Sequence, residues 1–247
     1  MKVNEFKSIL KKKKCDLALF YTGDSARINP QLFYFSGYKG VGVLVVPAEK
    51  EPFLIVPKME FEAAKMSSIK KIYPMEKKKF FESVYGIIKK NRLKTRTIAI
   101  DKNHFTLNAF KYFKKQFKNV KSKDVSLDCL RLREIKNDDE IRILKKSCNY
   151  ADKILQKAIK EFNGFRTESE MAAFLEYEAK KFGLELSFNP IVASGSNGSM
   201  PHHEPKNEKM KNGFCVIDFG VKYRGYCSDI TRTVYFGNPT KKEKEMY

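Results

Sequence analysis

The chain has 247 residues, of which 42% are hydrophobic and 32% charged, and its formal net charge is +20 at pH 7. This composition is typical of globular proteins and excludes collagen-like, coiled-coil and disordered chains. No apolar run approaches the roughly 20 residues that a membrane-spanning helix needs, so no membrane partner is expected. The charged start, MKVNEFKSILKKKK, has no apolar stretch of signal-peptide length, which predicts a cytoplasmic protein.

The positive charge is concentrated in one half of the chain. Residues 1–125 carry 28 basic and 11 acidic side chains, a net charge of +17, whereas residues 126–247 carry 21 and 18, a net charge of +3. Such a basic half could attract nucleic acid. Only nine of the 49 basic residues are arginine, however, the side chain that bidentate phosphate recognition favours. We therefore interpret the lysines as a solvated surface and do not expect nucleic acid as a partner.

Five cysteines at irregular spacings include no C-x-x-C pair. An odd number without such a pair indicates reduced thiols rather than a disulfide or zinc framework.

In the first half, short apolar runs alternate with amphipathic stretches. Strands are predicted at residues 17–21, 41–46, 53–56 and 97–100, which are rich in β-branched or aromatic side chains. Helices are predicted at residues 4–13, 80–90 and 106–117, where apolar residues recur three and four apart, and a buried turn or short helix at 29–38. Together these elements predict an α/β domain, with His104 in a structural role.

The lysine excess ends near residue 124, so we predict one domain at residues 1–124 and a second at 125–247. The second domain begins with two helices, each preceded by a capping box. An N-x-x-E box opens a long amphipathic helix at residues 137–162, and a T-x-x-E box opens another at 167–183. Two β-rich segments follow and are joined by the short connection VKYRG, which predicts a β-hairpin.

The first strand of this hairpin carries Asp218, and the second strand carries Asp229. If residues 223–224 form a two-residue loop, the two aspartates lie directly opposite each other, with Cβ atoms roughly 5 Å apart. Carboxylates that close repel each other unless they are protonated or bridged by cations, and two divalent ions about 3.5 to 4 Å apart would fit between them. If the loop instead has three residues and a bulge, the two aspartates lie on opposite faces of the hairpin. Both registers stay open, as does a capping role for Asp218 with Asp229 solvated.

A loop shortly before the first aspartate strand, ASGSNGSMPHHEP, carries His202 and His203. Histidine on such a loop can bind metal or donate a hydrogen bond to a substrate oxygen. The loop is not a phosphate cradle, because it lacks the Gly-Lys-Ser/Thr ending of a P-loop.

Residues 191–240 resemble the pita-bread metallopeptidases, and are closest to the Xaa-Pro dipeptidases (prolidases) and Xaa-Pro aminopeptidases. The D-F-G…G-Y-x-S-D-x-T-R-T pattern of that family is present at residues 218–233, and its P-H-x-x-P element precedes it. Residues 131–152 are similar to the opening helix of the family's catalytic domain. Residues 1 to about 124, with YTGDSARINPQLFYFSGY, resemble the creatinase-type N-terminal domain that accompanies prolidases.

The resemblance implies an α/β creatinase-like N-terminal domain followed by an α+β pita-bread domain. It also implies that Asp218 and Asp229 bind two divalent metal ions (Mn, Co or Zn), that Asp229 bridges them, and that His202 rather than His203 faces the substrate. In the family, a histidine and two glutamates beyond the second aspartate complete the centre. Because they have no counterpart before Tyr247, we expect the pita-bread domain to be incomplete and this chain to be inactive.

For the complete protein, the resemblance implies a homodimeric, metal-dependent exopeptidase. Its substrates would be small peptides with proline second, a metal-held hydroxide would attack the scissile carbonyl, and His202 would stabilise the oxyanion or orient the substrate. A different aminopeptidase specificity or a creatinase-like amidinohydrolase stays open. The alternative from another class is a non-catalytic pita-bread protein that binds nucleic acid or protein partners, which the basic half and the missing ligands suggest. The intact aspartate pair counts against that alternative.

Overall fold

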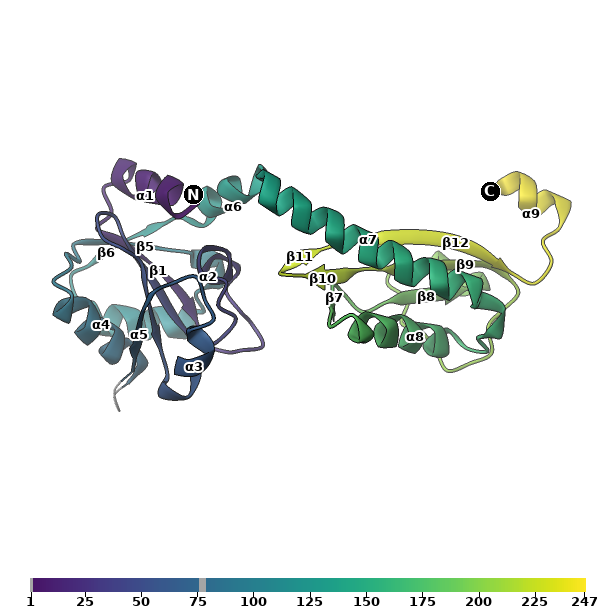
Figure 1. Cartoon of the computed structure of the whole chain (residues 1–247), viewed down its shortest axis with the longest axis horizontal. Helices are drawn as coiled ribbons and strands as arrows, with labels where there is room; N and C mark the ends of the chain where they lie inside the picture. The colour runs from purple at the N-terminus through teal and green to yellow at the C-terminus, as the bar shows by residue number, and fades with distance from the viewer. Residues whose placement is uncertain (1, 76–78) are drawn as a thin grey trace. The chain divides into compact units, whose positions relative to one another are not determined.

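The computed structural model describes residues 2–75 and 79–247 and divides the chain into two compact units, Met1–Ile135 and Lys136–Tyr247 (Figure 1). This division lies past the boundary predicted after residue 124. The reason is helix α6 (Ser126–Glu134), which packs on the first unit: Cys129 is buried in a core of that unit, and Lys2 Nζ donates to the Leu132 carbonyl at 3.0 Å. The lysine content therefore falls about ten residues before the chain passes from the first unit to the second.

A six-stranded mixed sheet forms the centre of the first unit, in the order β4-β3-β2-β1-β5-β6. Its strands are β1 (Leu17–Thr22), β2 (Gly42–Pro47), β3 (Phe53–Val56), β4 (Lys71–Pro74), β5 (Thr97–Ile100) and β6 (Lys121–Asp124). The four predicted strands are all present, and β1 runs antiparallel to β2 and parallel to β5. The two edge strands β4 and β6 were not predicted, because KIYP and KSKD carry the charged, weakly apolar sequences typical of sheet edges.

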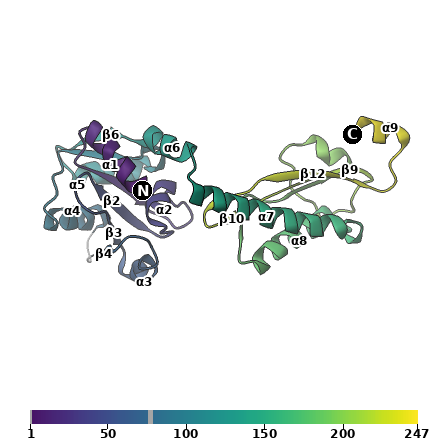
Figure 2. The ribbon, with the colours of Figure 1, turned by 45° about the horizontal axis from the view of Figure 1, so that its top comes forward.

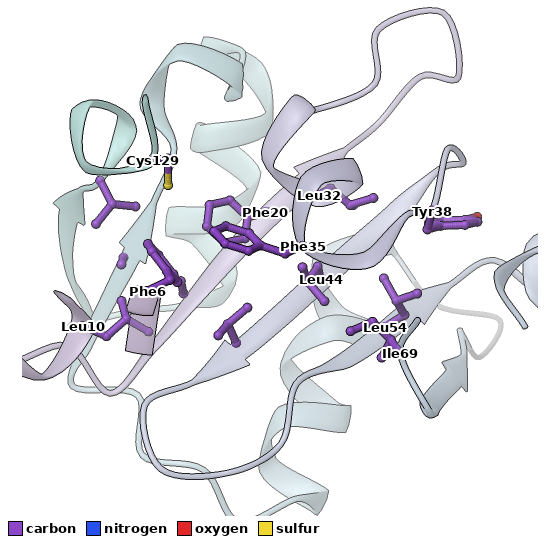
Figure 3. Packing of buried hydrophobic residues seen from close by; sticks show 14 of the residues in the cluster. Phe6, Leu10, Phe20, Leu32, Phe35, Tyr38, Leu44, Leu54, Ile69 and Cys129 are labelled. Atoms are coloured by element: carbon purple, nitrogen blue, oxygen red, sulfur yellow. The ribbon is translucent and has the colours of Figure 1, made fainter. Parts of the chain in front are cut away.

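Helices cover both faces of this sheet (Figures 1 and 2). They are α1 (Lys2–Lys12), α2 (Pro30–Ser36), α3 (Phe61–Ala64), α4 (Phe80–Lys90), α5 (Leu107–Gln116) and α6. Alternate residues of β1 point to opposite faces: Phe20 packs in one core with Phe6 and Phe35, as Figure 3 shows, whereas Leu19 packs in the other core with Phe113. The predicted α/β architecture is confirmed, and the segment 29–38 contains the short helix α2.

His104 lies on a short 3-10 helix, Lys102–His104, that follows β5. Its Nδ1 is 2.7 Å from Oδ2 of the buried Asp101, and Oδ1 of Asp101 accepts a hydrogen bond from Ser126 Oγ at 2.8 Å. These contacts connect the end of β5 to the start of α6, as the structural role predicted for His104 requires.

The second unit places two helices against strands arranged in two small sheets. Its elements are α7 (Asp138–Lys160), α8 (Glu168–Lys181), β7 (Glu185–Leu186), β8 (Ile191–Ser194), β9 (Gly213–Phe219), β10 (Val221–Tyr223), β11 (Tyr226–Cys227), β12 (Ile230–Phe236) and α9 (Lys241–Met246). The strand orders are β12-β9-β8 and β11-β10-β7. In both ribbon views α7 lies along these strands (Figures 1 and 2). Both predicted capping boxes are present, at Asn137 with Glu140 and at Thr167 with Glu170.

One apolar core holds this unit together. Leu155 of α7, Leu175 of α8 and Ile217 of β9 are at most 2% exposed and belong to one cluster. Among the described residues, no helix of either unit combines the length and apolarity that crossing a membrane requires.

Candidate metal centre and active site

The predicted hairpin forms, but its loop is one residue later than predicted. Strands β10 and β11 pair Lys222 with Cys227, which leaves Arg224 and Gly225 as the two-residue loop in place of residues 223–224. Both loop residues have left-handed backbones, with φ of 50° and 85°. Two consecutive positive φ values are characteristic of the type I′ turn that joins tightly paired strands.

The new register changes the partner of Asp218. In the β9–β12 ladder Asp218 lies opposite Thr231, and the Thr231 hydroxyl donates to Asp218 Oδ1 at 2.8 Å. The register that would place Asp229 directly opposite Asp218, one of the two left open by the sequence, is therefore not the one that forms. Asp229 precedes Thr231 by two residues, and alternate residues of an extended chain share a face, so Asp229 is the diagonal neighbour of Asp218. The two side chains interact, as the shared face predicts.

A glycine allows the two segments to approach each other at this point. A Cβ atom on Gly220 would lie 2.0 Å from the backbone carbonyl oxygen of Ser228, the residue before Asp229. No side chain larger than hydrogen can be accommodated there without moving one of the strands. Gly220 therefore sets how closely the backbone that carries Asp229 approaches the end of β9.

The carboxylate pair has the electrostatics of a cation site. Partial desolvation raises the pKa of the exposed Asp229, and the charge of Asp218 and a hydrogen bond between the two side chains raise this pKa further. Each effect disfavours the second negative charge, and a divalent cation beside both carboxylates would reverse that penalty. Carboxylate oxygens are hard ligands suited to divalent ions, so Asp218 and Asp229 fit the metal centre that the resemblance implies.

His202 lines the same cavity as the two aspartates. This cavity has a volume of about 390 Å³, and its wall also contains Phe188 and Ile191. His202 is exposed, whereas its neighbour His203 is only 5% exposed. All three predicted site residues are thus brought together. Within residues 2–75 and 79–247, no three histidine, cysteine, aspartate or glutamate side chains are grouped closely enough to hold a metal ion.

A further functional candidate, Glu168, was not predicted from the sequence. It is the first residue of α8, is 2% exposed, and accepts five hydrogen bonds. One of the donors is His203, whose Nε2 is 2.7 Å from Glu168 Oε2. In sequence, Glu168 resembles any acidic residue in a first helical turn, where acids are common because the helix dipole favours them. No local pattern distinguishes it.

Glu168 is ionised despite its burial. Burial raises the pKa of its carboxyl group, but hydrogen bonds from Asn197, from the backbone and hydroxyl of Ser194 and from His203 together lower this pKa from 4.5 to about 2. Because an ionised carboxylate can only accept hydrogen bonds, the His203 Nε2 carries a proton and donates it. Glu168 thereby fixes the orientation of the His203 ring.

Comparison with known proteins identifies relatives for both units. Residues 2–135 match the family model for the creatinase/prolidase N-terminal domain, and residues 142–247 match the model for metallopeptidase family M24. An uncharacterized peptidase of Staphylococcus epidermidis is 32% identical over the whole chain, which spans 69% of that protein. The Xaa-Pro dipeptidase of Pyrococcus furiosus is 37% identical over 87% of this chain and 61% of its own length.

Solved structures show the same relationship. The prolidase from Pyrococcus horikoshii OT3 superimposes with a TM-score of 0.83 at 31% identity, and 99% of this chain and 67% of that chain are covered. The X-Pro aminopeptidase from Thermotoga maritima MSB8 superimposes with a TM-score of 0.82 at 27% identity, with 95% and 67% covered. The chain therefore spans about two thirds of the length of these relatives.

Proposed function

Because the chain belongs to metallopeptidase family M24 and carries a creatinase/prolidase N-terminal domain, we propose that the protein is a metal-dependent exopeptidase that hydrolyses the bond between an N-terminal residue and proline. The observation that carries this proposal is the cavity that Asp218, Asp229 and His202 share. Relatives named Xaa-Pro dipeptidase, prolidase and X-Pro aminopeptidase support the specificity. A non-catalytic binding protein would give no reason for two interacting carboxylates to line a cavity.

Asp218 and Asp229 would hold two divalent ions, Mn²⁺, Co²⁺ or Zn²⁺. When bound, such ions polarise a carbonyl oxygen and lower the pKa of water to near neutrality. The hydroxyl of Thr231 holds Asp218 Oδ1 and so limits rotation of this carboxylate. The other ligands of the two ions would be supplied by groups other than the described residues.

His202 would act on the substrate. Its exposed imidazole lines the cavity, where it can donate a hydrogen bond to the scissile carbonyl oxygen as negative charge develops there. The apolar wall formed by Phe188, Pro190 and Ile191 would receive the proline ring. In this proposal the protein is a cytoplasmic homodimer, and its substrates are small peptides.

Hydrolysis of Xaa-Pro dipeptides by the complete protein in the presence of Mn²⁺ or Co²⁺ tests the proposal. Asp229→Asn should lower kcat/KM by at least about 100-fold, since even residues that only support metal ligands contribute roughly 10- to 100-fold. Asp138→Asn, an exposed first-turn position of α7, serves as the control and should retain wild-type activity. If no Xaa-Pro dipeptide is hydrolysed in any divalent metal, the proposed function is wrong.

A further inference from the structure

We propose that Glu168 is a positioning residue for His202: its buried carboxylate holds the loop that carries His202, so that this imidazole reaches the substrate oxygen. The inference rests on the proposed function. Glu168 touches neither aspartate in any described hydrogen bond, and it would act through the backbone and His203 rather than on the substrate.

The carboxylate collects donors from separate parts of the chain. Oε1 accepts from the backbone nitrogen and hydroxyl of Ser194, at 2.7 and 2.8 Å, and from Asn197 Nδ2 at 2.9 Å. Oε2 accepts from His203 Nε2 at 2.7 Å and from the backbone nitrogen of Lys206 at 3.1 Å. One side chain thus joins the start of α8 to the end of β8, to the following 3-10 helix and to the loop beyond it.

The loop has few other internal anchors. Between residues 195 and 209, the buried residues are Asn197 and His203, and both donate to Glu168. Both anchors are polar, so this segment is not held by an apolar core of its own. The start of α8 adds further contacts: Ser169 Oγ donates to the Pro205 carbonyl at 3.0 Å, the Ser169 backbone nitrogen donates to the Lys206 carbonyl at 3.2 Å, and Thr167 pairs with Lys209 in an isolated β-bridge. His202 is bonded directly to His203, so the position of its backbone follows from where Glu168 holds that ring.

Only a carboxylate matches this set of partners. The groups around Glu168 are N–H or O–H donors, and an ionised carboxylate offers acceptors on both oxygens. Glutamine has the same shape but would direct an NH₂ group at one set of donors and leave those donors without an acceptor. Glu168→Gln therefore separates the shape of the side chain from its capacity to accept hydrogen bonds.

A matched control is available in the same helical turn. Glu170 also accepts hydrogen bonds from backbone N–H groups at the start of α8, from Arg166 at 2.6 Å and from Thr167 at 3.3 Å, but it lies outside the His202 loop.

We expect Glu168→Gln to lower kcat for an Xaa-Pro dipeptide by at least about 10-fold with KM changed less than about twofold, because His202 acts mainly on the transition state. Mn²⁺ affinity should not change, since both aspartates lie on other segments. Glu170→Gln should retain wild-type kcat.

Unchanged kcat in Glu168→Gln, or an equal loss of kcat in Glu170→Gln, would overturn the inference.

A second pair of variants applies if Glu168→Gln fails to fold. His203→Gln keeps an amide N–H that can donate to Glu168, whereas His203→Leu keeps none. The glutamine variant should retain a kcat at least about 5-fold above that of the leucine variant, in line with the cost of a lost buried hydrogen bond. Equal kcat values would contradict the role assigned to Glu168.

A readout independent of activity comes from NMR of the imidazole rings. The chain has three histidines, so their ring nitrogens give few signals. In the wild-type protein we expect a slowly exchanging Nε2 proton on His203, and in Glu168→Gln an exchange at least about 10-fold faster, as expected when roughly 1.4 kcal/mol of local stability is lost. Slow exchange that persists in Glu168→Gln contradicts this inference alone, whereas a wild-type protein without hydrolysis contradicts the proposed function alone.

Discussion

Glu168 and Asp229 are two carboxylates of one unit whose pKa values move in opposite directions. Desolvation raises the pKa of both, fully buried Glu168 and exposed Asp229 alike. Around Glu168, N–H and O–H donors more than compensate for that burial, whereas the main neighbour of Asp229 is another carboxylate, Asp218. The first arrangement stabilises its own negative charge, and the second needs a cation from outside. The proposed anchor and the proposed metal ligand thus differ in their surroundings, although the residues are chemically alike.

The ionisation of Glu168 predicts a specific dependence of stability on pH. Its folded-state pKa is about 2 against an ordinary value of 4.5. A lowered pKa stabilises the fold above the unfolded-state value, and this contribution is lost as pH falls through the folded-state value. It should therefore disappear between about pH 5 and pH 2, and be about 3 kcal/mol at neutral pH.

Urea unfolding of the wild type and of Glu168→Gln, measured from pH 7 down to the lowest pH at which both remain folded, checks this expectation. The difference in free energy of unfolding between the two proteins should shrink as the pH falls below about 5. Other titrating groups contribute equally to both proteins and cancel. A difference that stays constant with pH would show that Glu168 is not ionised in the folded state.

The hairpin that carries the two aspartates depends on the backbone contact at Gly220. Gly220→Ala should weaken Mn²⁺ binding by at least about 10-fold with both aspartates intact, because the added methyl group must displace the Ser228 carbonyl. Gly164→Ala is the control, since a Cβ atom there meets nothing within 4 Å. Mn²⁺ titration by calorimetry measures the effect. Equal affinities in the two variants would show that the close approach does not position the site.

Helices α7 and α8 hold the strands of the site through the apolar core of the second unit. Leu175 of α8 is fully buried there, so Leu175→Ala should reduce the free energy of unfolding by about 2 to 5 kcal/mol. Tyr177→Ala, on the same helix but 61% exposed, should cost less than about 1 kcal/mol. Urea unfolding gives both values, and a Tyr177 variant as unstable as the Leu175 variant would contradict this packing.

The two units have separate cores, which predicts that the first can fold alone. The complete six-stranded sheet and both of its apolar clusters lie within Met1–Ile135. A fragment of residues 1–135 should therefore give a mixed α/β circular dichroism spectrum and a single cooperative thermal transition. A fragment that ends at residue 124 lacks α6 and should unfold at a lower temperature. A non-cooperative transition in the longer fragment would contradict the division of the chain.

Much of the architecture could be predicted from the sequence. Capping boxes such as Asn137 with Glu140, apolar periodicity and β-branched runs involve residues a few positions apart, and these patterns correctly placed the central strands and the long helices. The family motifs likewise identified the two domain types. Of the two registers left open by the sequence, the one with Asp218 and Asp229 on a shared face is nearer to the structure, because a shift of the strand pairing by two positions preserves which residues face the same side.

The remaining features depend on contacts between distant residues. The loop at Arg224 and Gly225, with Thr231 as the partner of Asp218, was decided by pairing along whole strands. Glu168 binds groups 26 to 38 positions further along the chain, and no local pattern records such a contact. The sequence alone determined the central strands, the long helices and the chemical types of Asp218, Asp229 and His202, because these follow from short-range periodicity and residue identity. The tertiary structure decided register and positioning, because these depend on which buried donors and acceptors meet when the chain is packed.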